Sequence, residues 1–246
     1  MKKYFQAPWS IQDILIIFSA TAILIVGTLL GMEILNLRTY IEASPYRTFY
    51  LLGIFLLQWI LILIPLIVLT LIKYKLKKKY FGFKKTGTWK IFKLVASGYL
   101  LFVGISFIIS LIILYTGLKI PGYQLQEKVL PIFGDGLLSI IIAGIIIVIV
   151  APPLEEIFFR GFLLRSLTNK VGIMYGSIFS AGIFAVFHMQ WQSIIPIFIL
   201  GLIINSLVLK SKSIWPAIYF HVFNNAIAFT FEVLIIKEVV PLETVV

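Results

Sequence analysis

Long apolar runs separated by short polar stretches dominate the chain. The runs fall at 11–35, 48–72, 94–116, 137–154, 171–188, 194–209 and 213–236. Most of them approach the roughly 20 residues that a helix needs to cross a hydrocarbon core. The pattern therefore predicts an all-α polytopic transmembrane helical bundle, with about seven spans expected and six or eight as the alternatives.

Composition supports a membrane protein and excludes an ordinary soluble domain. The chain is 61% hydrophobic and only 13% charged, whereas soluble domains have about 25% charged residues. We therefore expect a multi-pass protein of the cell membrane. The first apolar run is longer than the core of a signal peptide, so we expect it to remain as a span.

The distribution of positive charge predicts an orientation and a lipid partner. The net charge is +11, and most lysines and arginines fall on the side of the N-terminus if seven spans alternate, which predicts a cytoplasmic N-terminus. The basic loop 73–93 contains aromatics, as some nucleic-acid-binding segments do. Its position beside a span instead favours anionic lipid, and we expect no nucleic acid. The absence of cysteine excludes disulfides, cysteine-ligated zinc and thiol catalysis.

The stretch APPLEEIFFRGFLLRSL (151–167) places charges where a membrane should disfavour them. A charge near the bilayer centre costs roughly 2.5–3.5 kcal/mol, so such residues usually serve a function. Glu156 and Arg160 are four residues apart on a helix, which predicts an ion pair. Glu155 lies about 100° around the helix and is left to face a cavity, where loss of hydration makes a carboxylate a better proton acceptor. The alternative is that Pro152 and Pro153 end the span and both glutamates lie among the headgroups.

The two histidines of the chain both lie in apolar segments, which suggests a role in the membrane interior. His188 and His221 together with Glu155 would suffice for a hydrolytic zinc site with ligands from three helices. The same residues also allow chemistry without a metal. In that case Glu155 deprotonates a water, and the two histidines with Asn225, one helical turn after His221, stabilise an oxyanion. Asparagine is an uncommon zinc ligand, so Asn225 slightly favours the second alternative.

The depths of the two histidines constrain the span that carries the glutamates. Strictly alternating spans would place His188 and His221 at depths that differ by about 15 Å. We therefore expect 137–167 to form one long tilted span, with Glu155 near mid-depth.

Three motifs in order resemble the CAAX prenyl protease and bacteriocin-processing (CPBP, or Abi) family. They are EEIFFR (155–160), FAVFH (184–188) and HVFNN (221–225), and the resemblance covers about residues 135–230. It implies a helical membrane metalloprotease in which the first glutamate, Glu155, activates water. The remaining catalytic residues implied are Glu156 and Arg160 as support and His188, His221 and Asn225 to complete the site. A zinc ion on His188, His221 and Glu155 is the expected cofactor.

The sequence as a whole predicts an intramembrane endopeptidase that cleaves a membrane-associated peptide or protein. Peptide maturation or bacteriocin self-immunity is the expected setting. We divide the chain into N-terminal transmembrane helices with the basic loop (1–125) and a catalytic helical core (126–246). The alternative function is a non-enzymatic membrane immunity or scaffold protein that binds a toxin or a sensor protein. A transporter is disfavoured because the chain shows no repeated halves.

Overall fold

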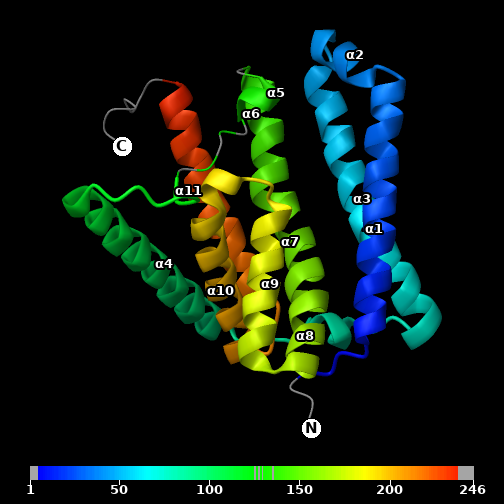
Figure 1. Ribbon diagram of the computed structural model, residues 1–246, viewed down its shortest axis with the longest axis vertical. Coiled ribbons are helices and arrows are strands. Elements are labelled where there is room, and N and C mark those ends of the chain that lie inside the picture. Colours follow the sequence, from blue (N-terminus) through cyan, green and yellow to red (C-terminus); the bar gives the residue numbers. More distant parts are fainter. Residues whose placement is uncertain (1–4, 125, 127, 129, 135, 238–246) are drawn as a thin grey trace. The chain divides into compact units, whose positions relative to one another are not determined.

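A computed structural model describes residues 5–124, 126, 128, 130–134 and 136–237 (Figure 1). Six helices in this part of the chain are long and apolar enough to cross a membrane. They are α1 (Ile11–Ile34), α3 (Arg47–Tyr74), α4 (Thr88–Thr116), Leu137–Val171, Trp191–Ser211 and α11 (Trp215–Ile236). The run at 171–188 forms a shorter apolar helix, α9 (Ile173–Phe187). The protein is thus an all-α, multi-pass membrane protein, as the sequence predicts.

The smaller elements connect or extend these helices. Within 191–211, a 3-10 turn (Trp191–Ser193) precedes α10 (Ile194–Ser211). Short helices follow α1 and precede the fourth span, namely α2 (Leu37–Ala43) and α5 (Leu130–Phe133). A 3-10 turn, Lys78–Phe81, lies in the basic loop.

The span that carries the glutamates is one continuous helix of 35 residues, Leu137–Val171. It alternates between α and π geometry along α6 (Leu137–Gly144), a π stretch (Ile145–Val150), α7 (Ala151–Glu156), a π stretch (Ile157–Leu163) and α8 (Leu164–Val171). A single long span is therefore confirmed.

Pro152 and Pro153 do not end this helix, contrary to the headgroup alternative. A proline inside a helix removes one N–H and clashes with the carbonyl one turn earlier. Here the preceding turn is already widened, because the Ala151 N–H bonds the Ile146 carbonyl five residues back. The wider π turn gives the proline rings room to continue the helix.

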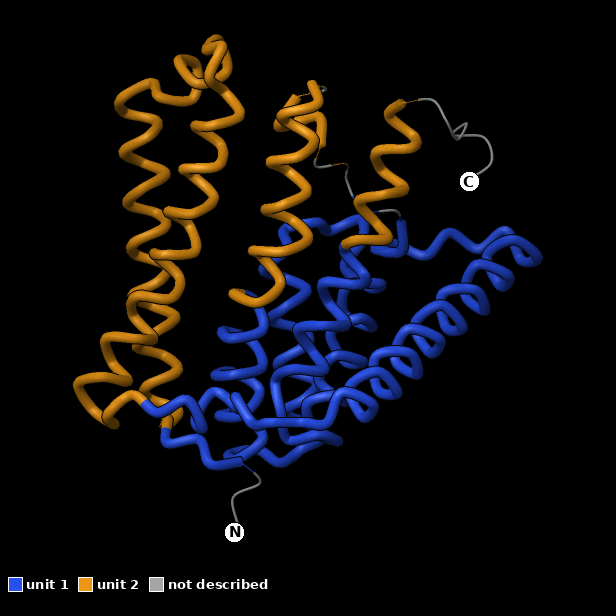
Figure 2. The backbone as a smooth tube through the Cα atoms, turned by 180° about the vertical axis from the view of Figure 1, so that it is seen from behind, with its two compact units in different colours: residues 1–8, 77–127, 155–225 blue, residues 9–76, 128–154, 226–246 orange. Residues whose placement is uncertain are grey.

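Packing divides the chain into two compact units, coloured separately in Figure 2. Unit 1 consists of 1–8, 77–127 and 155–225, and unit 2 of 9–76, 128–154 and 226–246. Every predicted site residue belongs to unit 1. The predicted functional division at residue 125, which lies outside the described residues, follows chain order and stays a prediction.

In unit 2, α1 packs on α3, and a polar cluster ties one end of α1 to the end of α3. Ser10 and Asp13 form a capping box at the start of α1. The buried Asp13 carboxylate accepts hydrogen bonds from Lys73 Nζ (2.7 Å), Tyr74 OH (2.5 Å) and the Ser10 backbone N–H (2.6 Å). Both carboxylate oxygens are thereby bonded.

In unit 1, α9 packs against α8 and α10, and α4 packs against α10. Loops at one end of this unit meet around the buried Arg165. Its guanidinium lies 4.2 Å from the Phe5 ring, and it donates to the Lys212 carbonyl at 3.1 Å. Gly82 (φ +82°) leaves the room for it, because a Cβ there would lie 2.0 Å from Arg165 Nη2. These contacts fix the turn that precedes α11 and therefore the start of the helix that carries His221.

Candidate active site

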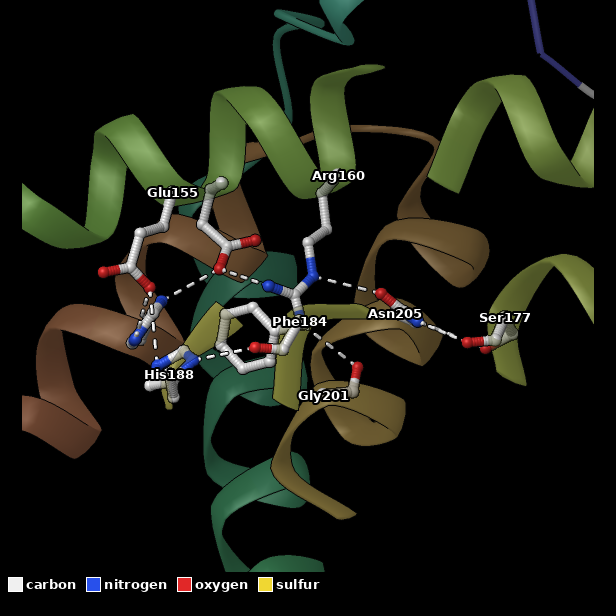
Figure 3. Close-up of polar contacts among 9 residues, drawn as sticks. Glu155, Arg160, Ser177, Phe184, His188, Gly201 and Asn205 are labelled. Carbon is white, nitrogen blue, oxygen red and sulfur yellow. Dashed lines mark hydrogen bonds and ion pairs between the residues drawn. The ribbon is translucent and has the colours of Figure 1, made fainter. Parts of the chain in front are cut away.

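The three predicted motifs meet in unit 1 (Figure 3). Glu155 and Glu156 lie at the end of α7, and Arg160 lies in the π stretch that follows it. His188 is the C-terminal cap of α9, and His221 lies on α11. Segments far apart in the sequence thus bring five of the six predicted site residues together.

Arg160 neutralises Glu156 in the interior of unit 1. Both side chains are fully buried, and Nη1 of Arg160 donates to Oε1 of Glu156 at 3.0 Å, so the predicted ion pair is confirmed. The guanidinium also donates to Asn205 Oδ1 (3.0 Å) and to the Gly201 carbonyl (3.2 Å). Its Cζ lies 4.1 Å from the centre of the Phe184 ring. A buried charge requires such compensation, because removing it from water costs several kcal/mol.

Two acceptors orient the histidine rings. His221 Nδ1 lies 2.9 Å from Glu156 Oε1, and His188 Nδ1 lies 2.8 Å from the Phe184 carbonyl. A carbonyl and an ionised carboxylate only accept hydrogen bonds, so we assign the proton of each neutral ring to Nδ1. Nε2 of each ring then carries a lone pair.

Both Nε2 atoms face the same carboxylate oxygen. Glu155 Oε2 lies 3.8 Å from His188 Nε2 and 3.7 Å from His221 Nε2, too far for direct hydrogen bonds. This oxygen is buried and has no hydrogen-bond partner among the described residues. Three acceptor atoms that face one another require something that supplies positive charge or protons, such as a water molecule or a cation.

The accessible side of this group is formed by Glu155 and His188. Their side chains are 15% and 24% exposed, whereas the His221 side chain is 3% exposed. A substrate would therefore approach Glu155 and His188 first.

The donor chemistry of the three acceptors suits the predicted zinc ion. Metal-binding histidines usually donate their other ring N–H to a carbonyl or carboxylate, as both rings do here. In the described part of the chain, however, no group of three or more His, Cys, Asp or Glu side chains could hold a metal ion as it stands. Zinc on Glu155, His188 and His221 therefore stays a prediction.

Buried phenylalanine rings lie beside the charged residues. Phe184 lies between Arg160 and His188, with its ring 4.4 Å from the His188 ring. An edge contact connects it to the buried Phe159, which packs in turn against Phe158 and the more exposed Phe187, and Phe158 also contacts the buried Phe162. Hydrogen bonds and ion pairs are stronger in such a low-dielectric environment.

Two polar partners of Arg160 were missed from the sequence. Asn205 and the Gly201 carbonyl belong to α10, for which no site residue was predicted. An amide within the uncharged run 194–209 was the available signal, because polar side chains inside a span are often functional. Asn225 lies one turn after His221, with its Oδ1 3.4 Å from Asn224 Nδ2. Its catalytic role stays a prediction.

Comparison with known proteins points to the same segment of the chain. Residues 137–227 match the model of the family described as Type II CAAX prenyl endopeptidase Rce1-like. A curated relative, "Putative membrane peptidase YdiL" of Bacillus subtilis (strain 168), is 30% identical over 77 residues, which are 31% of this chain and 32% of the relative. The match thus spans about a third of that relative's length. No solved structure matches the chain significantly.

These matches confirm the resemblance predicted from the three motifs. The segment that carries the candidate site is similar to the Rce1-like CAAX prenyl endopeptidase model over residues 137–227. The relative is named for a peptidase located in a membrane, which agrees with the six apolar helices of this chain.

Proposed function

We propose that the protein is an intramembrane endopeptidase in which Glu155 activates the attacking water. The observation that carries this proposal is the buried Oε2 of Glu155, which has no hydrogen-bond partner in the described part of the chain and faces two histidine lone pairs. A water in contact with these atoms can donate its protons to two of them. It is then held with its oxygen free to attack a peptide carbonyl.

The proposed reaction conserves its protons within the site. Glu155 takes a proton from the water as the water oxygen bonds to the carbonyl carbon of the scissile peptide. The tetrahedral intermediate then collapses, the C–N bond breaks, and Glu155 returns the proton to the leaving nitrogen. Glu156, paired with Arg160, keeps His221 in the tautomer that turns its Nε2 toward the water.

A zinc ion on His188, His221 and Glu155 is the cofactor we propose, in accordance with the lone pairs that these residues present. When bound, it would polarise the scissile carbonyl and make the water more acidic. Elemental analysis of the purified protein should find about one zinc per chain, and a His188→Gln, His221→Gln double variant should contain none. Hydrolysis that survives thorough chelation, in protein without metal, would contradict the cofactor.

The substrate we propose is a membrane-associated peptide or protein, in the setting of peptide maturation or bacteriocin self-immunity. The basic loop 73–93 would bind anionic lipid at the membrane surface. We propose that this loop has no role in nucleic-acid binding, because its lysines lie at the end of α3, between α3 and α4, and in the first turns of α4, beside two apolar helices.

The test compares peptide termini in membranes of cells that produce the wild type, Glu155→Gln or Glu232→Gln at matched levels. Glu232 is a control glutamate outside the site, on α11, where it accepts the Leu130 N–H. Cleaved ends should appear with the wild type and Glu232→Gln and disappear with Glu155→Gln. Identical profiles for all three proteins would overturn the protease proposal. A wild-type phenotype that persists in Glu155→Gln would favour the non-enzymatic immunity or scaffold function.

A further inference from the structure

Asn205 is fully buried, and both the oxygen and the nitrogen of its side-chain amide form hydrogen bonds. Its Oδ1 accepts the Arg160 Nε–H at 3.0 Å, and its Nδ2 donates to the Ser177 carbonyl at 2.9 Å (Figure 3). The Ser177 hydroxyl lies farther from Nδ2, at 3.4 Å. Asn205 therefore connects the backbone of α9 to the guanidinium on the glutamate-bearing span.

The chemistry of this position requires an amide. Arg160 Nε–H can only donate, and the Ser177 carbonyl can only accept, so the residue between them must offer one acceptor and one donor. Leucine has nearly the same shape but offers neither. A protonated aspartic acid offers both and matches asparagine in size.

The contacts of Arg160 continue to a histidine of the site. Arg160 Nη1 and His221 Nδ1 both donate to Oε1 of Glu156, at 3.0 and 2.9 Å. The position of the guanidinium therefore sets the position of that oxygen, and the oxygen sets the ring of His221. Asn205 holds the opposite side of the same guanidinium and touches neither Glu155 nor the histidines in the contacts described.

We propose that Asn205 is a positioning residue for hydrolysis, acting through Arg160 and Glu156 on His221. This inference rests on the proposed function. Outer partners of this type usually change activity by about 10–100-fold when they are removed. Because Asn205 does not contact the substrate in this scheme, its loss should lower kcat and leave KM nearly unchanged.

The experiment measures kcat and KM of purified full-length variants on a substrate identified by the comparison of peptide termini. Asn205→Leu should lower kcat by about 10–100-fold with KM within about threefold of wild type. Asn205→Asp should recover most of kcat, because it keeps the acceptor for Arg160. Ser177→Ala is the matched control and should resemble the wild type, since the 2.9 Å bond uses the backbone carbonyl.

Asn205→Leu with wild-type kcat would overturn the inference, since a residue needed only for packing tolerates an apolar side chain of equal shape. If Asn205→Leu fails to accumulate, the inference is tested with Asn205→Asp instead. A folded Asn205→Asp variant whose kcat is as low as about 1% of the wild-type value would then overturn the inference. Glu155→Gln separates the two proposals. Full activity in Glu155→Gln contradicts the proposed function, whereas an inactive Glu155→Gln beside a fully active Asn205→Leu contradicts the role of Asn205 alone.

Discussion

Two carboxylates, Asp13 in unit 2 and Glu155 in unit 1, have opposite surroundings. Asp13 in unit 2 is bonded at both oxygens by Lys73, Tyr74 and Ser10. Glu155 in unit 1 has a buried oxygen that is without a hydrogen bond among the described residues and faces the acceptor atoms of two histidines. Asp13, which links α1 to α3, thus has hydrogen bonds at both of its oxygens. Glu155, where we propose chemistry, has an oxygen without one.

The difference extends to the neighbouring charges. Asp13 lies in the first turn of α1 and Lys73 in the last turn of α3, so each charge is also favoured by its helix dipole. The glutamates lie in the middle of a continuous span, where neither helix end assists them. Arg160 compensates the negative charge of Glu156. In the contacts described, the negative charge of Glu155 has no such cationic partner. Sites that break local rules of stability in this way are commonly functional.

The largest expected effect is on activity, from Glu155→Gln. The amide fills the same space but cannot take the proton of water, so turnover should fall about 10³-fold or more. The thermal midpoint in detergent should change little, because the lost charge has no partner to leave behind. A loss of turnover that merely parallels a loss of folded protein would show that Glu155 is structural, like Asp13.

Glu156→Gln should affect both properties. It leaves the Arg160 charge buried without its carboxylate, which costs about 3 kcal/mol of unfolding free energy, and it releases the ring of His221. Denaturant unfolding in detergent and turnover measure the two effects. The double variant Glu156→Gln, Arg160→Met should regain stability without regaining activity. Recovery of both properties would refute the orienting role of Glu156.

Asp13→Asn should lower stability and spare catalysis. The amide loses the charge-assisted bonds from Lys73 and Tyr74, which lowers the unfolding free energy by about 2 kcal/mol. Turnover per folded molecule should remain at the wild-type value. Lys73→Met should cost less, because the Lys73 side chain is half exposed. A lower kcat for Asp13→Asn, measured at the same concentration of folded protein, would show that Asp13 also contributes to catalysis and would contradict the proposed difference between the two carboxylates.

The smallest expected effect is on stability, from replacing Ser180, whose buried hydroxyl is polar but uncharged. Ser180 Oγ is fully buried on α9 and lacks a hydrogen-bond partner in the described part of the chain. Ser180→Ala should be neutral or stabilise the protein by up to about 1 kcal/mol, since it removes an unsatisfied group. The shift of the thermal midpoint measures this. A clear destabilisation would mean that this hydroxyl, unlike Glu155 Oε2, is satisfied in the membrane.

Much of the fold was predictable, because hydrophobic length alone specifies a membrane helix. The run at 48–72 becomes Arg47–Tyr74, and the run at 213–236 becomes Trp215–Ile236. The run at 137–154 continues to Val171 because Glu156 and Arg160 pair with each other inside the protein. Their spacing of four residues made that pair predictable as well.

The remaining features depend on contacts between helices, which spacing along the chain does not encode. Nothing near Asn205 in the sequence indicates that its amide meets Arg160, 45 residues away. The tautomers of His188 and His221 likewise follow from the carbonyl and carboxylate that each ring meets. The π geometry before Pro152 could not be inferred from a run of isoleucine and valine.

The two π stretches flank the single α-helical segment, Ala151–Glu156, that carries both glutamates. Each π stretch contains one residue more than an α-helix that covers the same length along the axis. Removing one residue from it therefore restores α geometry and leaves the flanking helical segments in their original rotation about the axis. Removing one within 151–156 would rotate Glu155 by about 100° relative to its neighbours. In an alignment of related chains, single-residue gaps therefore belong at 145–150 and 157–163. A deletion in either π stretch would shorten the chain while Glu155 and Glu156 continue to face the same neighbouring residues.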